Sequence, residues 1–385
     1  MDRNRRKLAY LAFAMHFITG VICMLVGSSM SLLVDFFQKP VEKVVLLGSA
    51  FSLGRTLTVY FVGKITEKYD PLKILFGGVC GVLAFMLGTV LIPNYFLAFV
   101  WAFLGGIGMS CQDTISPLIL SRVFTKNYSS SLSAGQSLYG LGGFAISFMI
   151  GVMLHANMPF SMANILLSVI GISMLIIIPS TKWEGEGETE EEKVKPIRLK
   201  DPRPAKAMMC VIIILYCCTC STLASYMTTI MESLGNSQEV SAYVLSAYNL
   251  CALLGSLAFS FILRKVSESA VLAFNSISTL IVFAITVLVN KSAMYFVGMS
   301  ITGFFTGVLF SIIVAIATRI DYEHISVAGA YISMFGGLGD IITPVITGSL
   351  VSAYGVTVVN KVVIVLLLMM TALSVVIYII TREEK

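Results

Sequence analysis

The chain has 385 residues, of which 57% are hydrophobic and 12% are charged. Soluble domains carry roughly a quarter charged residues, so this composition excludes a water-soluble enzyme and predicts a protein of the lipid bilayer. A membrane-spanning helix takes about 20 residues, so the chain has room for roughly a dozen spans and for no separate catalytic domain. The formal net charge of +5 comes from short, scattered basic loops, which argues against a nucleic-acid-binding face.

Apolar runs with few or no charges predict twelve transmembrane helices, six on each side of one long polar segment. In the first half the predicted spans are Leu8–Val34, Val44–Val62, Ile74–Ile92, Tyr95–Ile119, Leu132–Leu154 and Phe160–Ile178. In the second half they are Ala207–Ile230, Val240–Ile262, Ala270–Val289, Met294–Ala317, Val327–Val351 and Val356–Ile380. Because the basic N-terminus leads into a full-length span, we expect a retained first helix rather than a cleaved signal peptide.

The polar segment from Lys182 to Lys206 begins acidic and ends basic, with three prolines. Such a composition cannot bury apolar surface, so the segment is predicted to be a linker. The chain is therefore divided into an N-terminal half (1–181), a linker (182–206) and a C-terminal half (207–385).

Lysine and arginine residues gather in alternate loops and so predict the orientation in the membrane. Outside the linker, the residues on the basic side are Arg3, Arg5, Arg6, Lys7, Lys64, Lys68, Lys73, Arg122, Lys126, Arg264, Lys265, Arg319, Arg382 and Lys385. Since cytoplasmic loops carry the excess of basic residues, both termini and the linker are expected in the cytoplasm, with the chain crossing the cell membrane many times.

The two halves repeat short sequence patterns at matching places in their helices. The repeated pairs are Leu53-Gly54 with Leu254-Gly255, Ala134-Gly135 with Ala328-Gly329, and Tyr95-Phe96 with Tyr295-Phe296. Two six-helix halves built on one plan are typical of a transporter that alternates access to a central site.

This pattern resembles the major facilitator superfamily. The loop after the second predicted span carries Gly63, Glu67 and Lys68, which is similar to the cytoplasmic loop motif of that family. The resemblance implies an all-α membrane fold of twelve helices in two pseudo-symmetric six-helix halves. The segment Gly135–Gly143 is similar to the glutamine-and-glycine pattern of the fucose permease branch, whose members are largely proton-coupled sugar symporters, and it lacks the proline of the antiporter signature.

Four ionisable side chains lie well inside predicted spans, namely His16, Arg55, Asp113 and Asp340. A charged side chain at mid-membrane costs at least about 2.5–3.5 kcal/mol, so each of them needs an explanation. None of the four has an ionisable counterpart in the other half, and this asymmetry favours a function. The structural alternative is a static pair that neutralises two buried charges.

Depth along the helices predicts which of these groups meet. Arg55 and Asp340 both lie roughly 18 Å below the outer surface, and the resemblance implies that their helices face each other across the halves, so we predict an inter-half ion pair. His16 and Asp113 both lie roughly 12 Å from the cytoplasmic side, on helices that line the cavity in the family. Asp113, His16 and Asp340 are therefore the candidates for carrying a coupling proton. Helix packing is the alternative role for His16.

Polar and aromatic side chains inside the spans are candidates for binding a solute, and each of them is also compatible with helix packing. These residues are Gln112, Gln136, Tyr139, Trp101, Tyr216, Tyr226 and Asn249. Tyr216 matches a tyrosine of the fucose permease branch. In that branch an acidic residue often stands four positions after the tyrosine, whereas this chain has Cys220 there.

The leading hypothesis is a secondary active transporter that moves a small polar solute, for example a sugar, by alternating access with proton coupling. The alternatives are a carrier of organic or inorganic anions that uses Arg55, and a drug:proton exporter. No phosphate-binding glycine loop is present that would indicate ATP as the energy source. We expect a monomer in membrane lipid that is not an enzyme, with no cofactor and no metal, whose partners are the solute and protons.

Overall fold

The computed structural model describes residues 3–66, 68–124, 128–183, 197–199, 201–263, 265–322 and 325–383. Within these ranges the regular structure is helical, and twelve helical segments are long and apolar enough to cross a membrane. The chain divides into two compact units, Met1–Glu191 and Glu192–Lys385. The predicted all-α membrane fold of twelve spans is confirmed.

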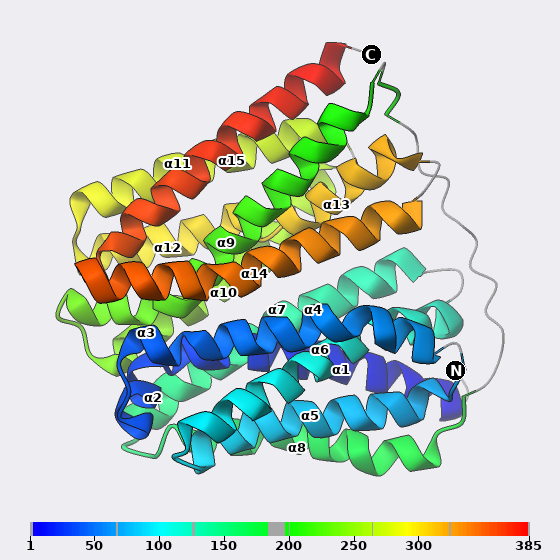
Figure 1. The fold of residues 1–385 in the computed structure, drawn as a ribbon, viewed down its shortest axis with the longest axis vertical. Helices are drawn as coiled ribbons and strands as arrows, with labels where there is room; N and C mark the ends of the chain where they lie inside the picture. Colours follow the sequence, from blue (N-terminus) through cyan, green and yellow to red (C-terminus); the bar gives the residue numbers. More distant parts are fainter. Residues whose placement is uncertain are drawn as a thin grey trace. The chain divides into compact units, whose positions relative to one another are not determined.

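The first unit holds six of the membrane-length segments (Figure 1). Its helices are α1 (Arg3–Ser28), α2 (Met30–Phe37), α3 (Val41–Val44), α4 (Leu46–Thr66), α5 (Pro71–Leu91), α6 (Tyr95–Val123), α7 (Tyr128–His155) and α8 (Ser161–Ile177), followed by the 3-10 turn η2 (Ile178–Ser180). Side chains define two of the starts. Asp70 accepts the backbone N–H of Leu72 at 2.9 Å, and Asn94 accepts that of Leu97 at 3.0 Å, so each satisfies an N–H that has no partner within the helix.

The second unit holds the other six membrane-length segments among the described residues. Its helices are α9 (Arg203–Ser233), α10 (Gln238–Ile262), α11 (Glu268–Val289), α12 (Ser292–Thr306), α13 (Leu309–Ile320), α14 (Ile325–Tyr354) and α15 (Val358–Glu383). Ser237 caps α10 by accepting the N–H of Val240 at 3.3 Å.

Two predicted spans are interrupted. The first predicted span, Leu8–Val34, comprises α1 and the start of α2, with a break at Ser29. Next to this break the Ser28 hydroxyl donates to the Met24 carbonyl at 2.6 Å, a bond that competes with the helical ladder and bends helices.

The span predicted at Met294–Ala317 is divided into α12 and α13 around Gly307. The Thr306 hydroxyl donates back to the Thr302 carbonyl at 2.9 Å. A side chain at position 307 would overlap the backbone carbonyl of Ala252, so glycine stands here although it weakens a helix.

The same helix pairs pack together in both units. In the first unit α1 packs on α7, α4 on α6, α5 on α6 and α5 on α8. In the second unit the corresponding pairs are α9 with α14, α10 with α12, α11 with α12 and α11 with α15. The sequence repeat therefore corresponds to a repeat of the packing.

Large apolar side chains are exposed along the helices of both units. Leu288 is 83% exposed, Phe96 75% and Ile176 71%. Such side chains would be unfavourable in water but are matched to lipid tails, so they mark helix faces suited to contact with the bilayer.

Glycines set the spacing of α1 and α7. A side chain at Gly142 of α7 would overlap the backbone carbonyl of Phe17 on α1, so the two backbones approach closely here. We expect Gly142→Ala to lower the free energy of unfolding by about 1–3 kcal/mol, because the helices must separate. Thermal unfolding in detergent measures this.

The matched control is Gly77→Ala in α5, where an added methyl group meets no atom within 4 Å. Its unfolding midpoint should equal or exceed that of the native chain, since alanine favours helix. Equal midpoints for the two variants would contradict the close packing of α1 and α7.

Candidate functional site

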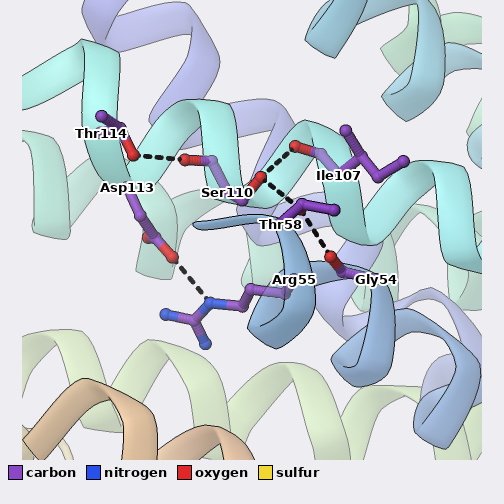
Figure 2. Close-up of polar contacts among 7 residues, drawn as sticks. All are labelled: Gly54, Arg55, Thr58, Ile107, Ser110, Asp113 and Thr114. Atoms are coloured by element: carbon purple, nitrogen blue, oxygen red, sulfur yellow. Dashed lines mark hydrogen bonds and ion pairs between the residues drawn. The ribbon is translucent and has the colours of Figure 1, made fainter. Parts of the chain in front are cut away.

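An ion pair joins α4 and α6 inside the first unit. Arg55 donates from Nε to the Oδ2 atom of Asp113 at 2.7 Å (Figure 2). The Arg55 and Asp113 side chains are 28% and 24% exposed, so the pair is only partly covered by protein. A charge-assisted hydrogen bond of this length is among the stronger polar contacts in proteins.

The pair forms because glycines let α4 and α6 approach closely. A side chain at Gly54 would overlap the carbonyl of Phe103, and one at Gly106 would overlap the carbonyl of Phe51. Arg55 directly follows the first of these glycines, so its side chain leaves α4 where the neighbouring helix is nearest.

Hydroxyl groups continue the polar strip between the two helices. The hydroxyl oxygens of Thr58 and Ser110 lie 2.8 Å apart, and Thr58 donates to the Gly54 carbonyl at 2.6 Å. Thr114 donates to the Ser110 carbonyl at 2.9 Å (Figure 2). The strip therefore offers hydroxyl oxygens beside the charged pair.

Sequence reasoning placed Arg55 and Asp113 in different pairs, although a common depth joins them. Arg55 lies 11 residues before the end of α4 at Thr66, and Asp113 lies 10 residues before the end of α6 at Val123. At 1.5 Å per residue both are roughly 16 Å from those ends. The missed signal was this shared distance, which appears only when both helices are measured from the same side.

The repeated half has the same helix crossing without the charges. Gly255 faces the carbonyl of Phe304 there, just as Gly54 faces that of Phe103. The positions that match Arg55 and Asp113 in the repeat are Ser256 and Val314. The crossing therefore needs the glycines and not the ion pair.

His16 lies in the interior of the first unit, and its side chain is fully buried. Its Nδ1 atom lies 2.8 Å from the Ala12 carbonyl, and its Nε2 atom has no hydrogen-bond partner among the described residues. The ring packs against Gly135 of α7, where an added Cβ atom would lie 2.8 Å from Nε2. Asp113 acts on His16 electrostatically, while its carboxylate is bonded to Arg55.

Asp340 lies on α14 in the second unit, half-buried, and it acts electrostatically on Cys218 and Cys220 of α9. The predicted pair of Arg55 with Asp340 would join the two units and stays a prediction. Within the first unit, Arg55 bonds to Asp113.

A second polar cluster joins α9, α10 and α12. Tyr248 and Thr306 have their hydroxyl oxygens 3.1 Å apart, and Tyr216 donates to the Thr306 carbonyl at 3.4 Å. Tyr248 also lies 3.9 Å from the Cys220 sulfur. Of these four residues, sequence reasoning had selected Tyr216 for binding. Tyr248 and Thr306 were missed because a single hydroxyl in an apolar helix gives no sequence signal.

The other candidates on α6 and α7 have different environments. Trp101 packs on Gly88 of α5. Its ring occupies the space that a side chain at position 88 would take, so it contributes to the packing of α6 on α5. Gln112 is buried, whereas Gln136 is exposed and Tyr139 half-buried.

The candidates on α9 and α10 are buried, and the loop motif is only partly described. Tyr226 has no exposed surface, and the Asn249 amide donates to the Leu245 carbonyl of its own helix at 2.9 Å. Gly63 is not at a close helix contact, since an added Cβ atom would meet nothing within 4 Å. Lys68 is exposed. Glu67 lies outside the described residues.

Comparison with known proteins finds related sequences along the whole chain. The family model of the Major Facilitator Superfamily matches residues 12–210 and 209–385. The uncharacterized MFS-type transporter YfkL of Bacillus subtilis (strain 168) is 22% identical, over 92% of this chain and 92% of its own. The inner membrane transport protein YdiN of Escherichia coli (strain K12) is 22% identical, over 87% of this chain and 81% of its own.

Solved structures share the fold. The transporter FucP in its outward conformation gives a TM-score of 0.64 at 15% identity, covering 98% of this chain and 99% of that one. A variant of the nucleoside transporter NupG gives a TM-score of 0.73 at 11% identity, covering 99% of this chain and 100% of that one.

Proposed function

Because this chain belongs to the Major Facilitator Superfamily, we propose that it is a secondary active transporter that couples the movement of a small polar solute to protons. The solute crosses by alternating access, in which the two halves open in turn to either side of the membrane. The ion pair of Arg55 with Asp113 is the observation that carries this proposal.

A carboxylate bonded to a guanidinium within a membrane span links proton binding to charge pairing. When Asp113 takes up a proton, it loses its negative charge, and the attraction to Arg55 falls. Exposure to water favours the carboxylate, whereas closure of the surrounding protein favours the neutral acid. Asp113 can therefore hold a proton in one access state and release it in the other.

The repeat supports a functional role for this pair. The second unit forms the same crossing of helices with a serine and a valine in place of the charges, so the fold does not require them. Charges kept inside a span in spite of their insertion cost are typical of proton and substrate pathways.

His16 and Asp340 are further candidates in the same proton pathway. His16 keeps a buried nitrogen without a hydrogen-bond partner near Asp113, which suits a transient proton acceptor. We also propose that Arg55 exchanges Asp113 for Asp340 between access states, since both acids lie inside membrane-length helices.

Two structural neighbours guide the choice of solute. FucP is a fucose:proton symporter, and NupG is a nucleoside transporter. Sugars and nucleosides both present several hydroxyl groups, which match the hydroxyl oxygens of Tyr216, Tyr248 and Thr306. Of the remaining candidates, Gln136, Tyr139 and Gln112 would add hydrogen bonds, and Trp101, Tyr226 and Asn249 would contribute packing around the solute.

A ligand screen tests the solute class. A ligand that binds only the folded state raises its apparent stability, so purified protein is heated with sugars, nucleosides, carboxylates or lipophilic cations. We expect sugars or nucleosides to raise the unfolding midpoint. A shift with carboxylates alone, lost in Arg55→Gln, would indicate the anion carrier, and a shift with lipophilic cations alone would indicate the exporter.

The orientation of the chain is a separate prediction, which rests on its basic loops. We propose that both termini and the linker lie in the cytoplasm of the cell. In intact cells, a membrane-impermeant maleimide should leave Arg198→Cys unlabelled, since residue 198 lies in the linker.

The matched control is Asn157→Cys, between α7 and α8 on the opposite side, which should be labelled from outside. Mass spectrometry of the two peptides distinguishes these cysteines from the eight native ones. Labelling of residue 198 but not of residue 157 would reverse the topology.

A further inference from the structure

The two acids that lie deep in the helices share a local sequence pattern, in which a hydroxyl residue and then a proline stand three and four positions after the acid. Asp113 is followed by Thr114-Ile115-Ser116-Pro117, and Asp340 is followed by Ile341-Ile342-Thr343-Pro344. In the described part of the chain, α6 and α14 are the helices with an internal proline. Each internal proline thus stands four residues after a membrane acid.

The acid and the proline are also absent together from the repeat. The positions that match Asp113 and Pro117 are Val314 and Thr318, and those that match Asp340 and Pro344 are both isoleucine. The two helices are not counterparts in the repeat, so the shared pattern is not explained by duplication of one half.

Proline changes the backbone at the acid itself. It has no N–H, so the carbonyl four residues earlier receives no helical hydrogen bond, and the ring pushes that carbonyl away. In α6 this is the carbonyl of Asp113, and in α14 it is that of Asp340. Each helical ladder is therefore open at the residue that carries the charge.

Hydroxyl groups beside each acid weaken the turn that precedes the opened one. Thr114 donates to the Ser110 carbonyl at 2.9 Å in α6, and Thr343 donates to the Gly339 carbonyl at 2.7 Å in α14. Bonds from a hydroxyl back to the preceding turn compete with the helical N–H and bend helices. The open carbonyl and the competing bonds together favour a hinge.

In α6 the hinge is held from the side by the ion pair. Asp113 and Pro117 lie on the same half-buried face of the helix, and Arg55 of α4 bonds to the carboxylate at the open turn (Figure 2). Loss of the charge on Asp113 would release this lateral restraint at the point where the helix bends most easily.

We propose that Pro117 and Pro344 are positioning residues, each of which makes its helix a hinge controlled by the charge on the acid four residues earlier. This inference rests on the proposed coupling role of the acids. Through the hinge, uptake of a proton becomes a change in the bend of the helix.

Amide hydrogen exchange in a double-mutant cycle tests the hinge without a known solute. The purified full-length chain is compared with Asp113→Asn, Pro117→Ala and the double variant, and exchange is measured for the peptide covering residues 110–121. With proline present, we expect Asp113→Asn to speed exchange by roughly three- to tenfold, because the charge-assisted bond that restrains the hinge becomes a weaker hydrogen bond to a neutral amide. Pro117→Ala should slow exchange by roughly two- to tenfold, because it restores one hydrogen bond.

The test of the hinge is whether the effects of Asp113→Asn and Pro117→Ala on the exchange rate depend on each other. In the Pro117→Ala background, Asp113→Asn should have less than half of its effect on the exchange rate. Pro159→Ala, in the exposed turn before α8, is the control background and should leave that effect unchanged. Pro117→Leu, which also restores the N–H, replaces Pro117→Ala if the latter yields no folded protein.

An equal effect of Asp113→Asn with and without Pro117, or no effect with Pro117 present, would overturn the inference for α6. The same cycle with Asp340→Asn and Pro344→Ala tests α14. The coupling role of the acids is tested separately by pH-driven transport. Failure of the hinge in hydrogen exchange and failure of proton coupling in transport are therefore distinguishable.

Discussion

Replacing Asp113 with asparagine is expected to abolish solute accumulation driven by a pH gradient while leaving solute exchange intact. Asparagine has nearly the shape of the protonated acid, so the variant is fixed in the proton-loaded form. It should still alternate between its two access states and exchange solute across the membrane. With one proton per solute, a gradient of one pH unit supports about tenfold accumulation in the native chain. Uptake into proteoliposomes, with and without the imposed gradient, measures the loss.

The matched control is Asp35→Asn, which changes an exposed acid on α2, beyond the C-terminal end of α1. This variant should accumulate solute as the native chain does. Full pH-driven accumulation by Asp113→Asn would exclude Asp113 as the coupling site and leave His16 and Asp340 as candidates. Loss of binding and of folded protein in this variant would instead indicate a structural aspartate.

Removing one member of the ion pair should destabilise the chain more than removing both. Arg55→Ala removes the cation that bonds to the Asp113 carboxylate, and Asp113→Ala removes the carboxylate that bonds to the guanidinium. We expect each single variant to lose about 1.5–3 kcal/mol of unfolding free energy, and the double variant to lose less than either single variant. Unfolding in detergent and the yield of folded protein report this difference.

A parallel cycle with Asp340 separates the two proposed partners of Arg55. If Arg55 also pairs with Asp340, the double variant Arg55→Ala with Asp340→Ala should recover stability relative to its single variants. Strict additivity in both cycles would remove the energetic basis of both pairings. Thr58→Val, which changes a neighbouring hydroxyl on α4 and no charge, controls for local repacking.

The fold could be predicted because the bilayer restricts the solutions. A chain this apolar must satisfy its backbone within helices, and the lengths of the apolar runs then give their number. The helix breaks were not predicted. They depend on short contacts such as that of Gly307 with the Ala252 carbonyl, which join residues distant in sequence.

The charged residues of the site could be selected from the sequence, but the bond between Arg55 and Asp113 could not. Insertion cost marks Arg55 and Asp113 as unusual, and the rise of a helix gives their depth. Which neighbouring helix each side chain faces depends on the crossing of α4 with α6, which is set by Gly54 and Gly106. Rotation about the helix axis is invisible in depth arithmetic, so Asp113 was matched with His16 instead.

The hydroxyl cluster of the second unit shows the same limit. Tyr216 was selected by resemblance, whereas Tyr248 and Thr306 meet it only because α9, α10 and α12 converge. Serine and threonine in membrane helices often bond to their own backbone, so their presence alone does not indicate a site. Their grouping into a site therefore becomes visible only when the helices are placed.

Proton movement that accompanies solute entry is the most direct test of proton-coupled transport. Proteoliposomes holding the native chain and a pH-sensitive dye are given, from outside, the solute that raises the unfolding midpoint, with no imposed pH gradient. We expect the lumen of native proteoliposomes to acidify as solute enters. In proteoliposomes with Asp113→Asn that are preloaded with unlabelled solute, labelled solute should enter by exchange without acidification. Solute entry into native proteoliposomes with an unchanged lumenal pH would exclude proton-coupled transport.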